Sequence, residues 1–276
     1  MYRDVCVSFR RNLLQRRITL ASNQIPLVKS ASRTMDIIEF VAKSAKPQNF
    51  TAILNYMDIP KSSLSILLQS LIQSDYLGYD ADTRVYFPGL KLIQIGAICI
   101  NNTDISREIF LGIKKLSDEF GETTHAGILD GRQIVYIAKH HASRDVSVVT
   151  SVGYRIPAHA TAIGKVLLAT LSQAELKSRF NGVQLERYTD RTITDFKVLL
   201  AELAKVAEQG FALDNQEIIP GGICVAAPII DKANKTVAAM SVTMAATRAW
   251  EGEMMATVIE KVRAAAGNVS LRLGKR

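Results

Sequence analysis

The stretch Asp58–Leu77, DIPKSSLSILLQSLIQSDYL, decides the fold of the first part of this 276-residue chain. It opens on the turn Asp58-Ile59-Pro60, and proline is disfavoured inside a helix but can begin one. Apolar residues then recur at helical spacing and form one stripe, made of Leu64, Leu67, Leu68, Leu71 and Ile72. The pattern predicts an amphipathic helix with a polar N-terminal turn.

The sequence on both sides of this helix completes a winged helix-turn-helix, predicted over residues 25–88. Upstream, helical periodicity predicts a first helix from about Ala31 to Lys46-Pro47 and a shorter one over Thr51–Met57. Downstream, YLGYDADTRVYF (residues 76–87) is typical of two strands joined by a tight turn. Three helices followed by a hairpin fit a winged helix-turn-helix, in which the helix beginning near Lys61 enters the DNA major groove.

The polar face of this predicted recognition helix supplies the candidate DNA-binding residues. Small hydroxyl and amide side chains can approach base edges and phosphates, and cationic side chains contact the backbone. The candidates are Lys61, Ser62, Ser63, Ser65 and Gln69, with Arg33 from the first helix and Arg84 from the wing. The alternative is a plain helical bundle with a solvated serine-rich face.

Charge is unevenly distributed along the chain, which carries a net charge of +8. Residues 1–95 hold 12 Lys/Arg and 7 Asp/Glu, whereas residues 96–276 hold 22 and 19. Residues 1–24 are predicted to be a basic, poorly ordered arm, and a non-native start explains their composition equally well. An excess of positive charge favours polyanionic partners, although it also fits a basic protein with no such partner.

Composition favours a globular cytoplasmic protein. Hydrophobic residues make up 48% of the chain, and no run of about 18 apolar residues predicts a membrane span. The three cysteines, Cys6, Cys99 and Cys224, lie far apart and form no metal-binding or disulfide pattern, which fits a reducing compartment. No cofactor and no membrane partner are expected.

The second half of the chain predicts an α+β domain. A Leu/Ile-rich linker helix over residues 89–103 leads into this domain, predicted over residues 104–276. THAGILDGRQIVYIAKHH and DVSVVTSV suggest three strands, helices follow at about 160–179 and 195–209, and FALDNQ, GICVAAPIID and TVAAMSVTMAA suggest three more strands before a helix over 250–272. Strands on either side of a helical middle predict a sheet with its helices on one side.

Five stretches follow one another in a specific order: PKSSLSILLQSL, YFPGLKLIQIG, RIPAHATAIGKVLLA, the segment from TDRTITDF to GGICVAAPI, and AAMSVTM. With them the chain, from about Val28 onward, resembles the IclR family of bacterial transcriptional regulators. The resemblance implies a winged helix domain, a linker helix and a GAF-like effector domain. Members of the family bind palindromic operators as dimers or tetramers and often control catabolism of small carboxylic or aromatic acids. The family usually has arginine where this chain has Ile66, so either the operator sequence or the affinity is expected to differ.

The same resemblance implies an effector pocket. Its implied contact residues are Ala162, Ile163, Asp214, Cys224, Ser241 and Thr243, and the neighbouring His159 is a further candidate at the lip of the expected pocket. Each is also explained as a core, strand or turn residue; His159 either contacts an anionic effector or satisfies a turn. Ser241 and Thr243 are two residues apart on a predicted strand and should face the same side.

The segment RIPAHATAIGKVLLA (155–169) contains a Gly-Lys pair but not a phosphate loop. A phosphate loop has the pattern GxxxxGK[ST], whereas here Lys165 is followed by valine. We instead expect a helix that starts near Ala160, with Gly164 at a close approach and Val166 to Leu168 in the core. Its N-terminal amides and dipole suit a small carboxylate.

Metal binding and catalysis find little support. The four histidines form no ligand pattern with cysteine, and the only plausible nucleophile is Cys224, with His159 as a conceivable partner. The leading hypothesis is a ligand-responsive, DNA-binding homodimer or homotetramer rather than an enzyme. The alternatives are a metabolite-binding protein or hydrolase with a vestigial DNA-binding domain, and non-specific nucleic-acid binding through the arm alone.

Overall fold

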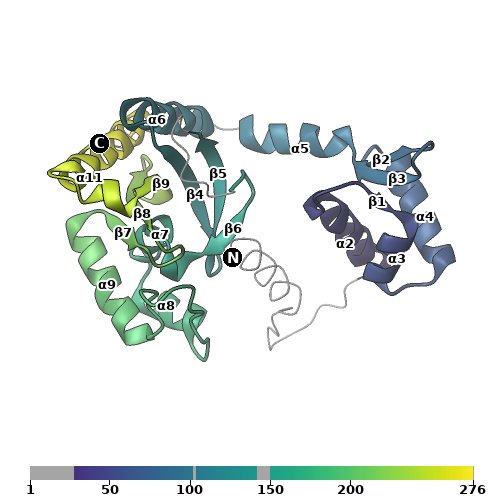
Figure 1. The fold of residues 1–276 in the computed structure, drawn as a ribbon, viewed down its shortest axis with the longest axis horizontal. Helices are drawn as coiled ribbons and strands as arrows, with labels where there is room; N and C mark the ends of the chain where they lie inside the picture. Colours follow the sequence, from purple (N-terminus) through teal and green to yellow (C-terminus); the bar gives the residue numbers. More distant parts are fainter. Residues whose placement is uncertain (1–27, 102–103, 142–149, 276) are drawn as a thin grey trace. The chain divides into compact units, whose positions relative to one another are not determined.

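The computed structural model describes residues 28–101, 104–141 and 150–275 (Figure 1). The chain divides into two compact units with the boundary between Ala97 and Ile98. The predicted basic arm lies outside the described residues, as does most of the strand predicted at DVSVVTSV, residues 145–152. No helix in the described segments is both long and apolar enough to cross a bilayer.

The first unit is a helix-turn-helix with a small antiparallel sheet in the order β1-β3-β2. Its elements are α2 (Lys29–Lys43), β1 (Gln48–Asn49), α3 (Phe50–Met57), α4 (Lys61–Gln73), β2 (Leu77–Asp80) and β3 (Val85–Pro88). The predicted winged helix-turn-helix is therefore confirmed. Its core joins the three helices and the hairpin through Ile37, Val41, Ile53, Ile59, Leu64, Leu68, Leu71 and Leu77.

Local chemistry fixes the boundaries of these helices. The Asn49 side chain accepts a hydrogen bond from the Ala52 N–H at 2.9 Å and caps α3. Asp58 adopts the left-handed conformation, with φ of 47°, and ends the same helix. Pro60 then precedes α4, where its missing N–H is not needed.

Two consecutive helices connect the small sheet to the second unit. They are α5 (Leu90–Asn101) and α6 (Asp104–Phe120), as expected for a linker helix followed by the first helix of a second domain. Gly121, with φ of 65°, donates its N–H to Ser117 O at 2.8 Å and ends α6.

The second unit is built on an antiparallel sheet in the order β6-β5-β4-β9-β8-β7. The strands are β4 (Thr123–Asp130), β5 (Gln133–His140), β6 (Arg155–Pro157), β7 (Ala212–Asn215), β8 (Gly222–Ile230) and β9 (Thr236–Ala245). A short 3-10 turn, η1 (Ala158–Ala160), and the helices α7 (Ala162–Leu168), α8 (Gln173–Phe180), α9 (Phe196–Gln209), α10 (Ala246–Ala249) and α11 (Met254–Arg272) complete it.

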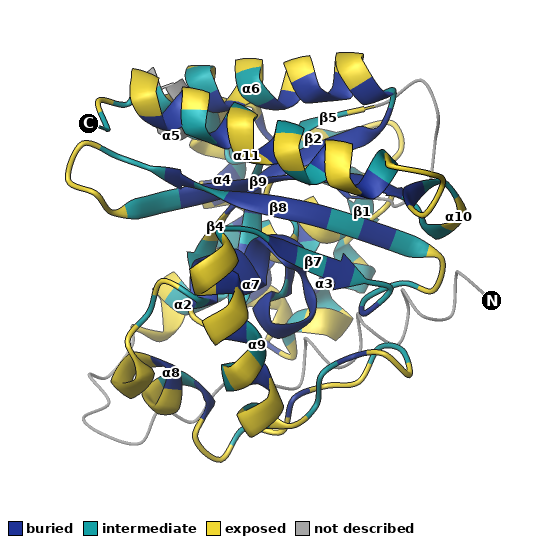
Figure 2. Cartoon of the chain, turned by 90° about the vertical axis from the view of Figure 1, so that its left-hand side faces the viewer, coloured by how far each residue is buried: buried dark blue, intermediate teal, exposed yellow. Residues whose placement is uncertain are grey.

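Helices cover both faces of this sheet, so the prediction that they lie on one side is wrong (Figure 2). One face packs against α6 and α11, and the other against α7, with α9 behind α7. Strand β9 shows the reason, because its residues are buried without a break from Ala238 to Met244. Alternate residues enter opposite cores: Met240 and Val242 belong to the α6–α11 core, and Ala239 belongs to the α7–α9 core.

Two of the predicted helices have different bounds in the structure. The helix expected over 160–179 consists of η1, α7 and α8, because Thr161 caps α7 and a capping box formed by Ser172 and Glu175 starts α8. The helix expected over 250–272 begins only at Met254, after the separate helix α10.

Candidate functional site

A cavity of about 40 Å³ lies between the sheet and the N-terminal end of α7. A volume of this size holds roughly three water molecules. Polar side chains come from the sheet and from Thr161, the N-cap of α7, and apolar ones come mainly from α7 and the segment that follows β7. The lining consists of His125, Tyr136, Ile156, Thr161, Ala162, Ile163, Asp214, Ile218, Ile219, Gly222, Cys224, Ser241 and Thr243.

Strand register assembles the polar side of the cavity from four neighbouring strands, β4, β9, β8 and β7. Asp214 on β7 is directly opposite Cys224 on β8, and Cys224 is directly opposite Thr243 on β9. A second pairing places Ser241 of β9 opposite His125 of β4. Directly opposed residues share a face of the sheet, so these side chains form one polar floor.

Some donors and acceptors of this floor are already used in hydrogen bonds within the protein. The Cys224 Sγ lies 3.2 Å from the Thr243 Oγ1. The Asp214 Oδ1 accepts the backbone N–H of Glu217 at 2.7 Å. The His125 Nε2 lies 2.8 Å from the Thr150 Oγ1, while its buried Nδ1 has no hydrogen-bond partner among the described residues.

Burial shifts the protonation of the groups around the cavity. It raises the pKa of the Asp214 carboxyl to about 7, although the hydrogen bond from the Glu217 N–H opposes this shift. Burial also raises the pKa of the Cys224 thiol and the Tyr136 hydroxyl, so both stay protonated at neutral pH. It lowers the pKa of His125 to about 3, which keeps this imidazole neutral. Near neutral pH, Asp214 is therefore the lining group that changes charge.

Helix α7 lies close against η1 because Gly164 has no side chain. A Cβ on Gly164 would lie 2.1 Å from the Ala158 carbonyl oxygen, so the expected close approach is confirmed. The Thr161 Oγ1 accepts the Gly164 N–H at 3.1 Å and caps the helix. Val166, Leu167 and Leu168 are buried, as predicted. With seven residues and one N-terminal amide already capped, α7 is a weaker anion site than the sequence suggested.

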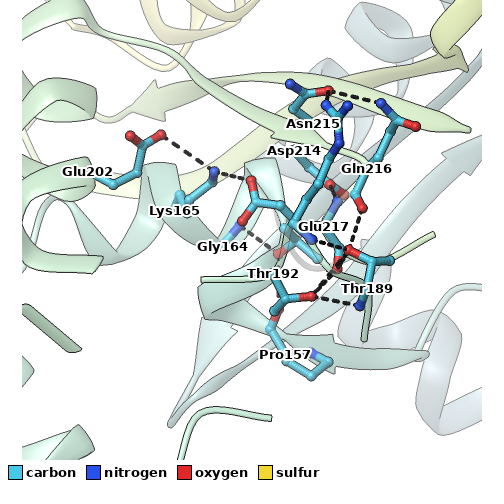
Figure 3. Close-up of polar contacts among 12 residues, drawn as sticks. Pro157, Gly164, Lys165, Thr189, Thr192, Glu202, Asp214, Asn215, Gln216 and Glu217 are labelled. Atoms are coloured by element: carbon cyan, nitrogen blue, oxygen red, sulfur yellow. Dashed lines mark hydrogen bonds and ion pairs between the residues drawn. The ribbon is translucent and has the colours of Figure 1, made fainter. Parts of the chain in front are cut away.

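A buried ion cluster holds α7 against the segment that follows β7 (Figure 3). The Lys165 Nζ, only 2% exposed, lies 2.5 Å from the Glu217 Oε1 and 3.5 Å from the Glu202 Oε1 of α9. The Thr192 hydroxyl donates to the Glu217 carbonyl oxygen at 2.6 Å, and the Thr189 hydroxyl donates to that of Gln216 at 2.7 Å. Lys165 is thus a structural cation and not a phosphate ligand.

The polar face of α4 carries most of the predicted DNA-binding residues. Lys61, Ser62, Ser65 and Gln69 are exposed, whereas Ser63 is half-buried. The other two candidates come from other elements of the same unit. Arg33 is half-buried on α2, and Arg84 is exposed in the wing turn with φ of 55°.

Both units of the chain match known protein families. Residues 30–81 match the IclR helix-turn-helix domain, and residues 97–271 match the family described as bacterial transcriptional regulator IclR C-terminal. The chain belongs to the IclR family of bacterial transcriptional regulators. It is therefore a DNA-binding regulator with an effector-binding domain, from a family of regulators and not of enzymes.

Similar proteins extend the match over most of the chain. The HTH-type transcriptional regulator XynR of Escherichia coli is 34% identical over 250 residues, 91% of this chain and 99% of XynR. The HTH-type transcriptional regulator KdgR of the same organism is 31% identical over 247 residues, 90% of this chain and 93% of KdgR. The crystal structure of Thermotoga maritima IclR superimposes with a TM-score of 0.75 at 27% identity, covering 89% of this chain and 99% of that one.

Six of the seven effector-site candidates of this IclR-family chain line the cavity. The exception is His159, which does not line the cavity and whose Nε2 donates to the Glu186 carbonyl oxygen at 3.0 Å. Burial lowers the pKa of this histidine, so it satisfies a loop as a neutral group. Cys224 and His159, considered as a catalytic pair, do not bond to each other: Cys224 lies beside the Thr243 hydroxyl, and His159 donates to the Glu186 carbonyl oxygen.

Sequence reasoning missed the other seven lining residues: His125, Tyr136, Ile156, Thr161, Ile218, Ile219 and Gly222. The centroids of the His125 and Tyr136 rings lie 4.6 Å apart. Their strands were predicted, but their place at the cavity depends on the pairing of β4 with β9.

Among the described residues there is no group of three or more side chains that could hold a metal ion.

Proposed function

We propose that this IclR-family regulator senses a small organic acid in the cavity and thereby changes its affinity for a palindromic operator beside a catabolic operon. The observation that supports this most is the row Asp214–Cys224–Thr243, which faces the apolar residues of α7. Ligand sites are mostly apolar with a few convergent polar groups that fix orientation, and this cavity has that composition.

The protonation of Asp214 explains how this cavity can accept an acid. No lysine or arginine lines it among the residues that the structure describes. With a pKa of about 7, Asp214 can carry a proton near neutral pH and donate a hydrogen bond to an incoming carboxylate. The volume of about 40 Å³ favours a short aliphatic acid over an aromatic one, which needs the lining side chains to move.

We propose that residues 25–88 read the DNA and that the linker, residues 89–103, couples effector binding to DNA binding. Lys61, Arg33 and Arg84 are proposed to contact phosphates, and Ser62, Ser63, Ser65 and Gln69 are proposed to contact phosphates or base edges. A palindromic operator requires a symmetric protein, so the DNA-bound form is proposed to be a homodimer or homotetramer. Effector binding then shifts the population between arrangements that bind DNA well and poorly.

The test measures operator affinity by fluorescence anisotropy, using the intergenic DNA beside the gene and a scrambled control. A panel of aliphatic and aromatic acids is compared with the matching neutral amides. We expect at least one acid, and not its amide, to change operator affinity. Operator should change the affinity for that acid by the same factor. Equal effects of acid and amide, or none from any acid, would contradict the proposal.

A matched pair of variants locates the effector. Thr243→Val removes a hydroxyl from the cavity, and Thr257→Val removes one from an exposed position on α11. Loss of one hydrogen bond to the ligand should raise the effector concentration for half-response about three- to tenfold in Thr243→Val only. Equal responses in the two variants would place the effector elsewhere.

A further inference from the structure

An isoleucine lies in the middle of the polar face of α4. Ile66 is 64% exposed, while the buried stripe of the same helix consists of Leu64, Leu68 and Leu71. Its exposed neighbours on the helix surface are Ser62, Ser65 and Gln69, one turn away or adjacent. The side chain therefore belongs to the face that carries the DNA-binding candidates and contributes nothing to the core of the unit.

Isolated exposed apolar residues are common in proteins, so exposure alone decides nothing. The position of Ile66 indicates a contact with DNA, because α4 is the second helix of the helix-turn-helix, and in such domains this helix lies in the major groove. Ile66 lies one turn after Ser62, in the N-terminal half of α4, and it is this half of a recognition helix that reaches base edges.

An isoleucine side chain has no hydrogen-bond donor or acceptor, so it cannot read the polar edges of guanine, adenine or cytosine. The major groove offers one apolar feature, the 5-methyl group of thymine. We propose that Ile66 is a specificity-determining residue that contacts the 5-methyl group of one thymine in each operator half-site. The proposal rests on DNA reading by α4 and is independent of the identity of the effector.

The experiment begins with operators selected from a random library by the full-length protein. Each thymine is then replaced by deoxyuridine, which keeps the base pair and removes only the methyl group. Dissociation constants are measured for the wild type, Ile66→Ala and Ile66→Val. One buried methyl group corresponds to about fourfold in affinity.

We expect one thymine per half-site at which deoxyuridine weakens the wild type and Ile66→Val about fourfold and leaves Ile66→Ala unchanged. At all other thymines the three proteins should respond alike. Ile66→Arg should instead prefer guanine at that position, because arginine pairs with two acceptors of guanine. Because Ile66 is exposed, these variants keep the buried core of the unit intact.

Three results would overturn the assignment. First, Ile66→Ala and the wild type could respond alike to deoxyuridine at every thymine although the protein still selects a sequence. This would exclude the contact between Ile66 and a thymine methyl group but not DNA reading by α4. Ile66→Ala could weaken selected and scrambled DNA equally, or dissociate the oligomer, which would give Ile66 a general or subunit-contact role. Failure to select any sequence would exclude base reading by α4 itself, whereas failure of the effector panel would leave the Ile66 result standing.

Discussion

At the scale of single residues, Asp214 is a buried carboxyl that changes charge near neutral pH. It is 5% exposed, and its pKa is raised to about 7 by burial. A carboxyl whose folded-state pKa exceeds its ordinary value binds its proton more tightly in the folded protein. The stability that the proton provides is therefore complete below about pH 4 and is lost as the pH rises to about 7.

This argument predicts the effect of Asp214→Asn, which keeps the shape and the acceptor for the Glu217 N–H but cannot ionise. At pH 8 the variant should be more stable to urea than the wild type, by up to about 4 kcal/mol. At pH 4 the two should unfold nearly alike. The control, Asp190→Asn, changes an exposed aspartate in the same unit and should show no such pH dependence. If the stability difference between Asp214→Asn and the wild type were the same at pH 4 and pH 8, ionisation of Asp214 would not be its cause.

The cavity residues also show what a single sequence can and cannot predict. The alternation along β9 correctly placed Ser241 and Thr243 on one face, because side-chain direction within a strand is local information. His125 and Tyr136 were missed because their position depends on which strands pair and in what register. His159 was assigned to the cavity from its sequence neighbours, but the turn at η1 directs its ring toward the Glu186 carbonyl oxygen.

At the scale of elements, close packing of α7 against η1 sets the position of the cavity roof. The expected Gly164→Ala effect follows from the 2.1 Å approach of a new Cβ to the Ala158 carbonyl oxygen, a backbone atom that cannot rotate away. We expect a loss of about 1–3 kcal/mol in the free energy of unfolding. Urea denaturation measures it.

Gly267→Ala in α11 is the matched control, because its new Cβ meets no atom within 4 Å apart from its chain neighbours and the backbone of its own helix. This variant should gain about 0.5–1 kcal/mol, since alanine is the better helix residue. If Gly164→Ala gained stability by a similar amount, α7 would not pack as closely as the structure shows.

The ion cluster between α7, α9 and the segment after β7 provides the next prediction. Lys165→Met leaves the Glu217 carboxylate buried without its closest cation and should cost about 3–5 kcal/mol. Lys165→Met combined with Glu217→Gln removes both charges and should recover most of this loss. A double-mutant cycle in urea measures the coupling. Additive losses would mean that the two side chains do not stabilise each other.

Element types were more predictable than their arrangement. The helix-turn-helix and its hairpin follow from local signals, the stripe of α4 and the turns on either side. The placement of helices on both faces of the large sheet does not, because it depends on packing between distant segments. The sequence of Ala238–Met244, AAMSVTM, gives one indication that both faces are covered, because its small and apolar residues suit a strand that is buried on both sides.

At the scale of the whole molecule, positive charge is separated from the fold that reads DNA. Residues 28–88 carry six Lys/Arg and six Asp/Glu and so have no net charge, whereas residues 1–27 carry five arginines and one aspartate. Attraction to the phosphate backbone grows with the number of cations that contact it. We therefore expect the helix-turn-helix to supply sequence preference and the five arginines of residues 1–27 to add sequence-independent attraction.

Deletion of residues 1–24 tests this division of roles. Each lost phosphate contact reduces the slope of log affinity against log salt by about 0.9, so losing five arginines should reduce it by up to about 4.5 per protomer. The ratio of affinities for selected and scrambled DNA should stay nearly constant, because base contacts lie in α4. Anisotropy titrations over a salt series measure both quantities. Unchanged slopes would show that these arginines do not contact DNA, and loss of the ratio with the slope would transfer DNA reading from α4 to the arm.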